Sequence, residues 1–271
     1  MKTIDIINKL WEDYSSHNPS VKKIHELFTA EGEAIQNDHI AFRTFNDVRL
    51  NIDVLSKPFI SAGYVEKNSY HFSEKKLNAK HFENPSEPYA PKIFISELII
   101  EEFSPFLQTT IRGIIDKIPN RILKSDEIIF MGNMWELPSY EIYLKLREES
   151  EYAAWVYVYG FRANHFTVLA NTLSKYNNLQ ELNFFLKKNG FMLNTSGGEI
   201  KGKPEELLEQ SSTMADIIKI KFKEGEFEIP SCYYEFARRY INGNGKLYSG
   251  FIAKSADKIF ESTNYYIKKT G

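Results

Sequence analysis

The feature of this sequence that most limits its fold is a motif that occurs twice. NDHIAFRTF occupies residues 37–45, and NHFTVLANT occupies residues 164–172. In each copy an Asp or Asn precedes a histidine, and a β-prone apolar run follows it. The interval from His39 to the glycine that ends the next helix-like segment is nearly the same as the interval from His165 to its equivalent. We interpret the chain as a duplicated unit; chance similarity between two β-α units is the alternative.

Each copy continues into one helix-like and three further strand-like segments, which predicts the order β-α-β-β-β twice. The first module is predicted over residues 37–102 and the second over 161–271, within a single domain covering 1–271. The first module has the helix NIDVLSKPFISAG and the later strands YVEKNSYHF, AKHFEN and PKIFISELII; the second has the helix NNLQELNFFLKKNG and the strands MLNTSGGEI, STMADIIKIKF and PSCYYEFARR. Amphipathic segments predict a helical cap over 1–36 and a helical connector over 103–160. The predicted fold class is therefore α+β with paired βαβββ modules.

The charge pattern argues against a nucleic-acid partner. The chain carries 34 basic and 36 acidic residues, a formal charge of −2, and neither sign forms a long block. We expect a small molecule or a second copy of the chain as the partner. A homodimer stays open, because 16 Tyr and 20 Phe could supply a dimer face as readily as a core.

The sequence predicts a cytoplasmic protein with no membrane partner. No apolar run approaches the roughly 20 residues that a membrane-spanning helix needs. The N-terminal segment MKTIDIINKLWEDY is amphipathic and lacks the apolar core of a signal peptide. Cys232 is the single cysteine of the sequence, so no internal disulfide can form, which favours a reducing compartment.

Two of the six histidines occupy equivalent positions. His39 and His165 each open the first strand of a module, so pairing of the modules would bring them into one cavity. We interpret them as two halves of a metal site. The other four are interpreted as surface or cross-strand residues: His17, His25, His71 and His81.

A metal held by two histidines needs a third ligand, and a carboxylate would leave open coordination positions. Glu235 is the candidate, because a carboxylate within the aromatic segment PSCYYEFARRY is costly to bury unless it is paired or binds a metal. The alternatives are an ion pair of Glu235 with Arg238 or Arg239, or an outward-facing position on the strand. Glu97 in FISELII is the rival ligand.

Arg43 indicates the kind of substrate. Residues four apart on a strand point to the same face, so Arg43 is predicted to lie on the side of its strand that carries His39. A guanidinium there suits a substrate carboxylate, which predicts an anion with a carboxylate remote from its metal-bound end. Neutralisation of Glu235 or another acid is the alternative.

Several segments together carry a family resemblance: DHIAFRTF, ESEYAAWVYVYGFRANHFTV, LLEQSSTMAD and IPSCYYEFARRY. The chain resembles the 2-oxoadipate dioxygenase/decarboxylase family, formerly a family of unknown function within the vicinal oxygen chelate superfamily. The resemblance spans most of the chain. It implies an Fe(II) site formed by His39, His165 and Glu235, with Arg43 as the anchor for a substrate carboxylate.

The resemblance also implies a reaction, the oxidative decarboxylation of 2-oxoadipate by O2 to 2-hydroxyglutarate and CO2 in lysine breakdown. The substrate would be its own 2-oxo acid, so no separate 2-oxoglutarate is expected to be consumed. The hydroxyls of Ser211, Ser212 and Thr213 are candidates for lining the substrate cavity. Thr167, two residues after His165, is expected on the same face as that ligand.

Other functions on the same scaffold stay open from the sequence. They are a glyoxalase-type isomerase, a ring-cleaving dioxygenase and a protein that binds small molecules without chemistry. Histidine and carboxylate ligands also accept Zn, Mn, Co or Ni, so the residues alone do not select iron.

Overall fold

The computed structural model describes residues 1–263, and the chain folds into two compact units. The first unit comprises residues 1–14, 41–164 and 217–229; the second comprises 15–40, 165–216 and the chain from 230 onward. The strands β1 (Asn37–Phe45) and β5 (Ala163–Leu169) each run from one unit into the other. The single domain and the module boundaries predicted above stay predictions, and positions 264–271 of the second module lie outside the described residues.

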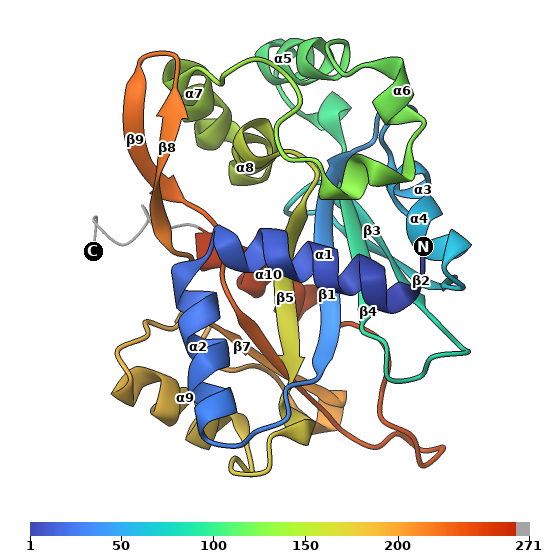
Figure 1. Ribbon diagram of the computed structural model, residues 1–271, viewed down its shortest axis with the longest axis vertical. Helices are drawn as coiled ribbons and strands as arrows, with labels where there is room; N and C mark the ends of the chain where they lie inside the picture. Colours follow the sequence, from blue (N-terminus) through green and yellow to red (C-terminus); the bar gives the residue numbers. More distant parts are fainter. Residues whose placement is uncertain (264–271) are drawn as a thin grey trace. The chain divides into compact units, whose positions relative to one another are not determined.

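The first unit contains a β-sheet and the helices of the predicted connector (Figure 1). Its strand order is β2-β3-β4-β1, with antiparallel β2–β3 and β3–β4 pairs. Besides part of β1, its elements are α1 (Thr3–Ser16, to residue 14), α3 (Ile52–Leu55), α4 (Lys57–Ser61), β2 (Val65–Phe72), β3 (Leu77–Glu83), β4 (Lys92–Leu98), α5 (Pro105–Ile115), α6 (Asn120–Leu123), α7 (Tyr140–Glu149), α8 (Glu151–Tyr159), β8 (Ile217–Phe222), β9 (Gly225–Pro230) and the short 3-10 helices Ile100–Glu102 and Asp126–Phe130.

Side-chain caps explain where the connector helices begin. Ser104, Ser139 and Ser150 each accept a hydrogen bond from a backbone N–H of the first turn of α5, α7 and α8. Every residue of α8 from Tyr152 to Tyr159 is buried, as expected for a helix that is apolar on all sides. The predicted helical connector contains the helices α5, α6, α7 and α8.

The strands β8 and β9 form a separate two-stranded sheet beside α7 (Figure 1). The ring of Tyr140 on α7 stacks on Phe227 of β9, with ring centroids 3.7 Å apart and planes 4° from parallel. Phe222 of β8 meets Tyr140 edge-on at 5.2 Å. Because a lone hairpin is marginal in water, these aromatic contacts hold it in place.

The second unit has the strand order β1-β5-β10-β7-β6. The β10–β5 pair is parallel, and the β10–β7 and β7–β6 pairs are antiparallel. Its further elements are α2 (Pro19–Ala30), α9 (Leu179–Lys188), β6 (Lys201–Lys203), β7 (Leu208–Ser212), β10 (Glu235–Arg239), α10 (Ala253–Phe260) and the short 3-10 helices Ala170–Thr172, Pro204–Glu206 and Glu261–Thr263.

An aromatic cluster packs α2 and α9 against this part of the sheet. The ring centroid of Phe28 on α2 lies 5.8 Å from that of Phe185 on α9 and 6.1 Å from that of Phe236 on β10. Asn178 caps α9 by accepting from the backbone N–H of Glu181 at 2.8 Å. Gly190 ends the helical segment with φ +86°, a conformation that favours glycine.

The element order confirms the predicted α+β class. A strand, a helical segment and three strands occur in the first run (β1, α3–α4, β2, β3, β4). The second run repeats this order with β5, α9, β6, β7 and β10, and the separate hairpin of β8 and β9 is inserted between β7 and β10. The amphipathic segment at the N-terminus forms α1 and α2. Within the described part of the chain, no helix is both long and apolar enough to cross a membrane.

Three strands of the second module were predicted with wrong bounds. MLNTSGGEI forms only an isolated bridge from Leu193 to Thr213, because Gly197 and Gly198 adopt positive φ and turn the chain. STMADIIKIKF is divided between the end of β7 and β8, which lies in the separate hairpin. PSCYYEFARR forms strand β10 only from Glu235, and its first residue, Pro230, ends β9, which was not predicted.

Candidate metal centre

The three predicted metal ligands come together within the second unit. His39 lies on β1, His165 on β5 and Glu235 at the start of β10. One ligand atom from each residue lies within 4.8 Å of the other two. The two histidines are 3% exposed and Glu235 is 1% exposed, so the group is closed off from bulk water.

The register of the strands explains why these side chains meet. Glu235 pairs with Thr167 across the parallel β10–β5 ladder and with Ser212 across the antiparallel β10–β7 ladder. Paired residues share a face, and residues two apart on a strand also share it. His165, Thr167, Ser212 and Glu235 therefore lie on one face of the sheet.

The geometry suits one divalent ion. Nε2 of His165 lies 3.2 Å from Oε2 of Glu235, and Nε2 of His39 lies 3.8 Å from Oε1. The centroids of the two imidazole rings are 5.6 Å apart and the ring planes are nearly perpendicular, so the rings are not stacked. Two imidazole nitrogens and one carboxylate are the donors that Fe(II), Mn, Co or Zn accepts. The residues present therefore fit the metal that the family resemblance implies.

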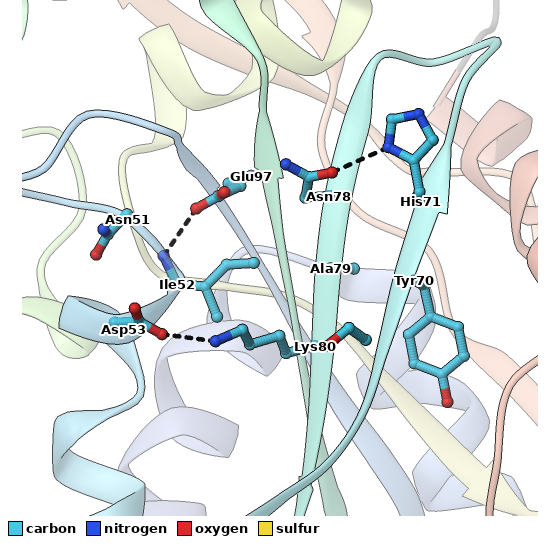
Figure 2. Close-up of a pocket in the computed structure, with 10 residues that line it drawn as sticks. Asn51, Ile52, Asp53, Tyr70, His71, Asn78, Ala79, Lys80 and Glu97 are labelled. Carbon is cyan, nitrogen blue, oxygen red and sulfur yellow. Dashed lines mark hydrogen bonds and ion pairs between the residues drawn. The ribbon is translucent and has the colours of Figure 1, made fainter.

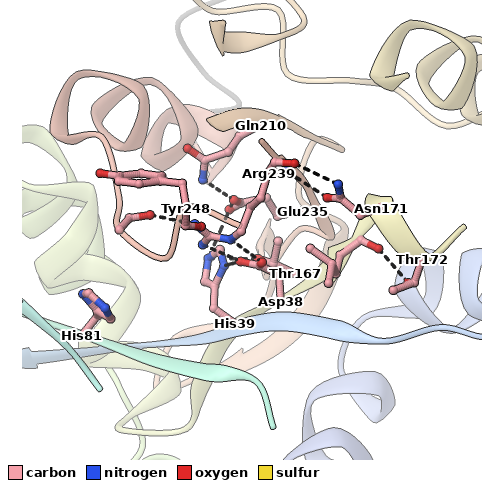
Figure 3. Close-up of polar contacts among 12 residues, drawn as sticks. Asp38, His39, His81, Thr167, Asn171, Thr172, Gln210, Glu235, Arg239 and Tyr248 are labelled. Atoms are coloured by element: carbon pink, nitrogen blue, oxygen red, sulfur yellow. Dashed lines mark hydrogen bonds and ion pairs between the residues drawn. The ribbon is translucent and has the colours of Figure 1, made fainter. Parts of the chain in front are cut away.

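The charge of Glu235 is compensated by its neighbours. Burial raises the pKa of this carboxyl group, but electrostatic attraction to the imidazoles of His39 and His165 and hydrogen bonds with His165 and Gln210 outweigh that effect, so the pKa lies below its ordinary value. Gln210 Nε2 donates to Glu235 Oε1 at 2.6 Å (Figure 3). The carboxylate is thus kept ionised, the state in which it can bind a cation.

Two further side chains border the histidines. The hydroxyl of Thr167 lies 3.1 Å from His39 Nε2 (Figure 3), on the face expected from the sequence. The ring of Tyr233 stacks on His165, with centroids 4.7 Å apart and planes 28° from parallel. These contacts orient both imidazoles; Tyr233 and Gln210 had not been assigned a role from the sequence.

The arginine proposed as an ion-pair partner of Glu235 has another partner. Arg239 binds both carboxylate oxygens of Asp38, from Nε to Oδ1 at 2.6 Å and from Nη2 to Oδ2 at 2.8 Å. Asp38 is the acid that precedes His39 in the repeated motif, so the motif itself held the signal for this residue. The alternative that Arg239 forms an ion pair with Glu235 was wrong.

The three candidate hydroxyls of the block 211–213 have different surroundings. Ser212 shares the face of Glu235, and its Oγ lies 2.8 Å from Ser262 Oγ. Ser211 points to the opposite face, where it donates to Asn183 Oδ1 of α9 at 2.8 Å. Thr213 follows β7, and its Oγ1 accepts from Tyr234 N at 3.0 Å. Ser212 alone of the three lies on the face of the ligands.

Arg43 lies on the part of β1 that belongs to the first unit. It is 2% exposed, and its guanidinium carbon lies 5.0 Å from the ring centroid of Tyr152 and 5.3 Å from that of Trp155. Among residues 1–263, Nε and Nη1 of Arg43 have no hydrogen-bond partner. A buried guanidinium with free donors is unfavourable unless an anion completes it.

Glu97, the rival ligand, lies in a different place. It helps to line a cavity of about 480 Å³ in the first unit, together with Asn51, Asp53, Asn78 and Lys80 among others (Figure 2). Its Oε2 accepts from the backbone N–H of Ile52 at 3.0 Å. The half-buried carboxylate is thus used in local structure, and the ligand group contains Glu235 instead.

The two histidines of the β2–β3 hairpin divide between surface and core, whereas His17 and His25 are half-buried. His71 is exposed on β2, where its Nδ1 lies 3.0 Å from Asn78 Oδ1. His81 on β3 is fully buried, with the Tyr70 hydroxyl 2.8 Å from its Nδ1 and Glu83 Oε1 3.3 Å from its Nε2. The expectation that His81 is half-exposed was wrong, because this part of β3 is covered on both faces.

The family model described as 2-oxoadipate dioxygenase/decarboxylase matches residues 5–127 and 128–246. A rice protein named 2-oxoadipate dioxygenase/decarboxylase, chloroplastic/amyloplastic, is 37% identical over 96% of this chain and 78% of its own. A glyoxalase-superfamily protein from Ralstonia eutropha is 18% identical, with TM-score 0.72 over 89% of this chain and 83% of its own, and supports the fold alone.

Two solved structures are similar to the chain over most of its length. A Shewanella frigidimarina protein with a provisional hydrolase name is 51% identical, with TM-score 0.88 over 93% of this chain and 98% of its own. The rice hydroxyglutarate synthase in complex with 2-oxoadipate is 36% identical, with TM-score 0.89 over 96% of this chain and 91% of its own. With the family model matching almost the whole length, the chain belongs to the 2-oxoadipate dioxygenase/decarboxylase family.

Proposed function

We propose that this chain is an Fe(II)-dependent dioxygenase that converts 2-oxoadipate and O2 into 2-hydroxyglutarate and CO2. The observation that carries the proposal is the buried group of His39, His165 and Glu235, with ligand atoms within 4.8 Å of one another, in a chain of this family. His39, His165 and Glu235 would hold the Fe(II) ion, which when bound would supply the activation of O2.

The atoms of this reaction balance without a further reductant. The bond between the first carboxylate carbon and the keto carbon breaks, and CO2 leaves. The keto carbon becomes the new carboxylate, and the neighbouring methylene gains the hydroxyl. Both atoms of O2 thus remain in the product. O2 takes up four electrons, two from the oxidative decarboxylation and two from the C–H bond of the methylene that becomes hydroxylated.

The chain's own residues would hold and orient the substrate. Arg43 is proposed to bind the carboxylate remote from the 2-oxo group, because its buried guanidinium has donors without a partner and its fork geometry suits a carboxylate. His39 and Arg43 are four residues apart on β1, so both project from the same face of that strand. Thr167 and Ser212, on the face of Glu235, are the proposed hydroxyl contacts.

The test is oxygen uptake by protein reconstituted anaerobically with Fe(II), across a panel of 2-oxo acids that includes 2-oxoadipate. We expect uptake equal to CO2 release, with both atoms of isotopically labelled O2 in 2-hydroxyglutarate. Turnover without oxygen uptake and without CO2 release would favour an isomerase on the same scaffold. Release of CO2 without oxygen uptake would indicate a non-oxidative decarboxylation and would reject the dioxygenase. Binding of 2-oxoadipate by iron-loaded protein without turnover would favour a binding protein.

Ligand variants connect the activity to the site. His39→Ala, His165→Ala and Glu235→Ala should each lose stoichiometric Fe(II) and oxygen uptake, because two remaining ligands hold the ion weakly. His71→Ala is the matched control, since this histidine is exposed on β2 and lies outside the group. A triad variant that retains full iron content and turnover would remove that residue from the proposal.

A further inference from the structure

A buried acid lies immediately before the first proposed ligand. Asp38 is 3% exposed, and its Oδ2 lies 2.8 Å from Nδ1 of His39 (Figure 3). The other ring nitrogen, Nε2, faces Glu235 and the hydroxyl of Thr167. The carboxylate therefore contacts the ring nitrogen that the proposed metal would not use.

Arg239 holds this carboxylate from the opposite side. Its Nε and Nη2 donate to the two oxygens of Asp38, and its Nη1 donates to the backbone oxygens of Tyr248 at 2.9 Å and Gly250 at 2.8 Å. The guanidinium carbon lies 5.2 Å from the ring centroid of Phe251, and that ring meets His39 edge-on at 4.9 Å. Besides their contact with each other, the Asp38 carboxylate is therefore held by Arg239 and the His39 imidazole is held by Phe251.

We infer that Asp38 and Arg239 are positioning residues that hold His39 with its proton on Nδ1 and its lone pair on Nε2, directed at the metal. Asp38 accepts a hydrogen bond from the Nδ1–H of His39, because an ionised carboxylate can only accept hydrogen bonds. A carboxylate on the far nitrogen fixes both the tautomer and the orientation of a ligand histidine. Arg239 fixes the carboxylate in turn through its two-pronged contact. The inference rests on the proposed metal site.

A purely structural role for the pair makes a different prediction. If Asp38 and Arg239 only joined β1 to the segment around Tyr248, their removal would lower stability and leave the tautomer of His39 unchanged. The two roles are separable because the tautomer can be measured in protein without metal, by long-range proton–nitrogen NMR on chains with labelled histidine. We expect His39 to carry its proton on Nδ1.

The informative variant is the double replacement Asp38→Leu/Arg239→Leu. It removes both charges together, and buried ion pairs are often replaced by apolar residues without loss of the fold. Without the acceptor, the neutral ring should shift toward the Nε2 proton that free histidine favours. Asp38→Asn is the milder variant, which keeps one oxygen but loses the charge, and its effect should be smaller in the same direction.

The second readout is affinity for Co(II), whose visible spectrum reports its ligands. The double variant should bind Co(II) about 10- to 100-fold more weakly than the unmodified protein, with an altered spectrum. Glu33→Gln is the matched control, because Glu33 is a buried acid of the same unit that accepts from the backbone N–H groups of Ser174 and Lys175 and is outside the ligand group. It should lose stability and keep its Co(II) affinity.

A background lacking His39 shows whether the pair acts through that ligand. In His39→Ala, the double replacement should not weaken the residual Co(II) binding further, because the imidazole that the pair orients is gone. An equal loss in both backgrounds, or a His39 proton on Nε2 in the unmodified protein, would overturn the inference. Failure of the unmodified protein to bind any metal, with the proton on Nδ1, would reject the metal site and leave the positioning role standing.

Discussion

At the scale of single residues, the buried charged side chains around the proposed metal centre are compensated by hydrogen bonds and ion pairs. Glu235 is surrounded by His39, His165 and Gln210, and Asp38 is surrounded by His39 and Arg239. Arg43 differs, because two of its buried donors have no hydrogen-bond partner within residues 1–263. Such an arrangement is stable in a protein that binds an anion at that point.

Arg43→Met should reduce kcat/KM for 2-oxoadipate by about 10- to 100-fold, since hydrogen bonds to a charged group contribute about 1.5–3 kcal/mol. The reduction should be small for a 2-oxo acid of the same length without the distal carboxylate, and Fe(II) affinity should not change. The measurement is kcat/KM for both acids with the iron-loaded enzyme. Equal losses for both acids would place Arg43 at the end that they share.

Glu97 gives a prediction about pH. Burial raises its pKa, so the folded state holds a proton that the unfolded state releases as pH rises, and ionised Glu97 costs stability above its folded pKa. Glu97→Gln should therefore raise Tm at neutral pH, and the gain should disappear below the ordinary glutamate pKa of about 4.3, where both forms are neutral. Melting curves across that range test this, with the exposed Glu74→Gln as control. A gain independent of pH would contradict it.

At the scale of elements, β8 and β9 form a two-stranded sheet that is stabilised by packing on a helix. Among the residues that the structure describes, no third strand joins the hairpin, and its aromatic side chains contact Tyr140 of α7. Lys223 N also donates to Pro138 O, just before that helix, at 2.9 Å. The hairpin therefore depends on α7 for its order.

Phe227→Ala should lower the free energy of unfolding by about 1–3 kcal/mol, because it removes a half-buried ring from the stack on Tyr140. Backbone amides of β8 and β9 should exchange their hydrogens faster than those of β3, which is paired on both sides. Urea unfolding and hydrogen exchange give the two values. Glu226 is exposed on the same strand, so Glu226→Ala should change neither the free energy of unfolding nor the hydrogen-exchange rates of β8 and β9.

At the scale of the whole molecule, the proposed metal joins three strands that are far apart in the sequence. His39, His165 and Glu235 come from β1, β5 and β10, so an ion bound to all three binds the folded chain and not the unfolded one. Binding of this kind stabilises the folded state in proportion to the logarithm of metal concentration.

Fe(II) or Mn(II) at 100 times its Kd should stabilise the protein by about 2.7 kcal/mol, seen as an increase in Tm under anaerobic conditions. Glu235→Ala should lose this increase, even if its metal-free Tm rises on removal of a buried carboxylate. His71→Ala should keep it. An increase that is unchanged in Glu235→Ala would mean that the ion binds elsewhere.

The sequence alone determined the features that depend on short-range pattern. The repeated Asx-His motif predicted two equivalent strands, the 3.6-residue period predicted the helices, and Gly190 was recognised as a helix end. An acid within an aromatic segment identified Glu235, because an unpaired buried carboxylate is too costly to be accidental. His39 and His165 were identified by a different argument, because both occupy the same place in the repeated motif.

Only the tertiary structure decided the features that depend on strand pairing between distant segments. The register of β7 and β10 separates Ser212 from Ser211 by face, and a shift of one residue would exchange them. Asp38, the partner of Arg239, is 201 residues away in the sequence. STMADIIKIKF is divided between two sheets, and its second part, β8, packs on α7. Local sequence specifies which residue types are available for a site, whereas long-range register specifies which of them meet.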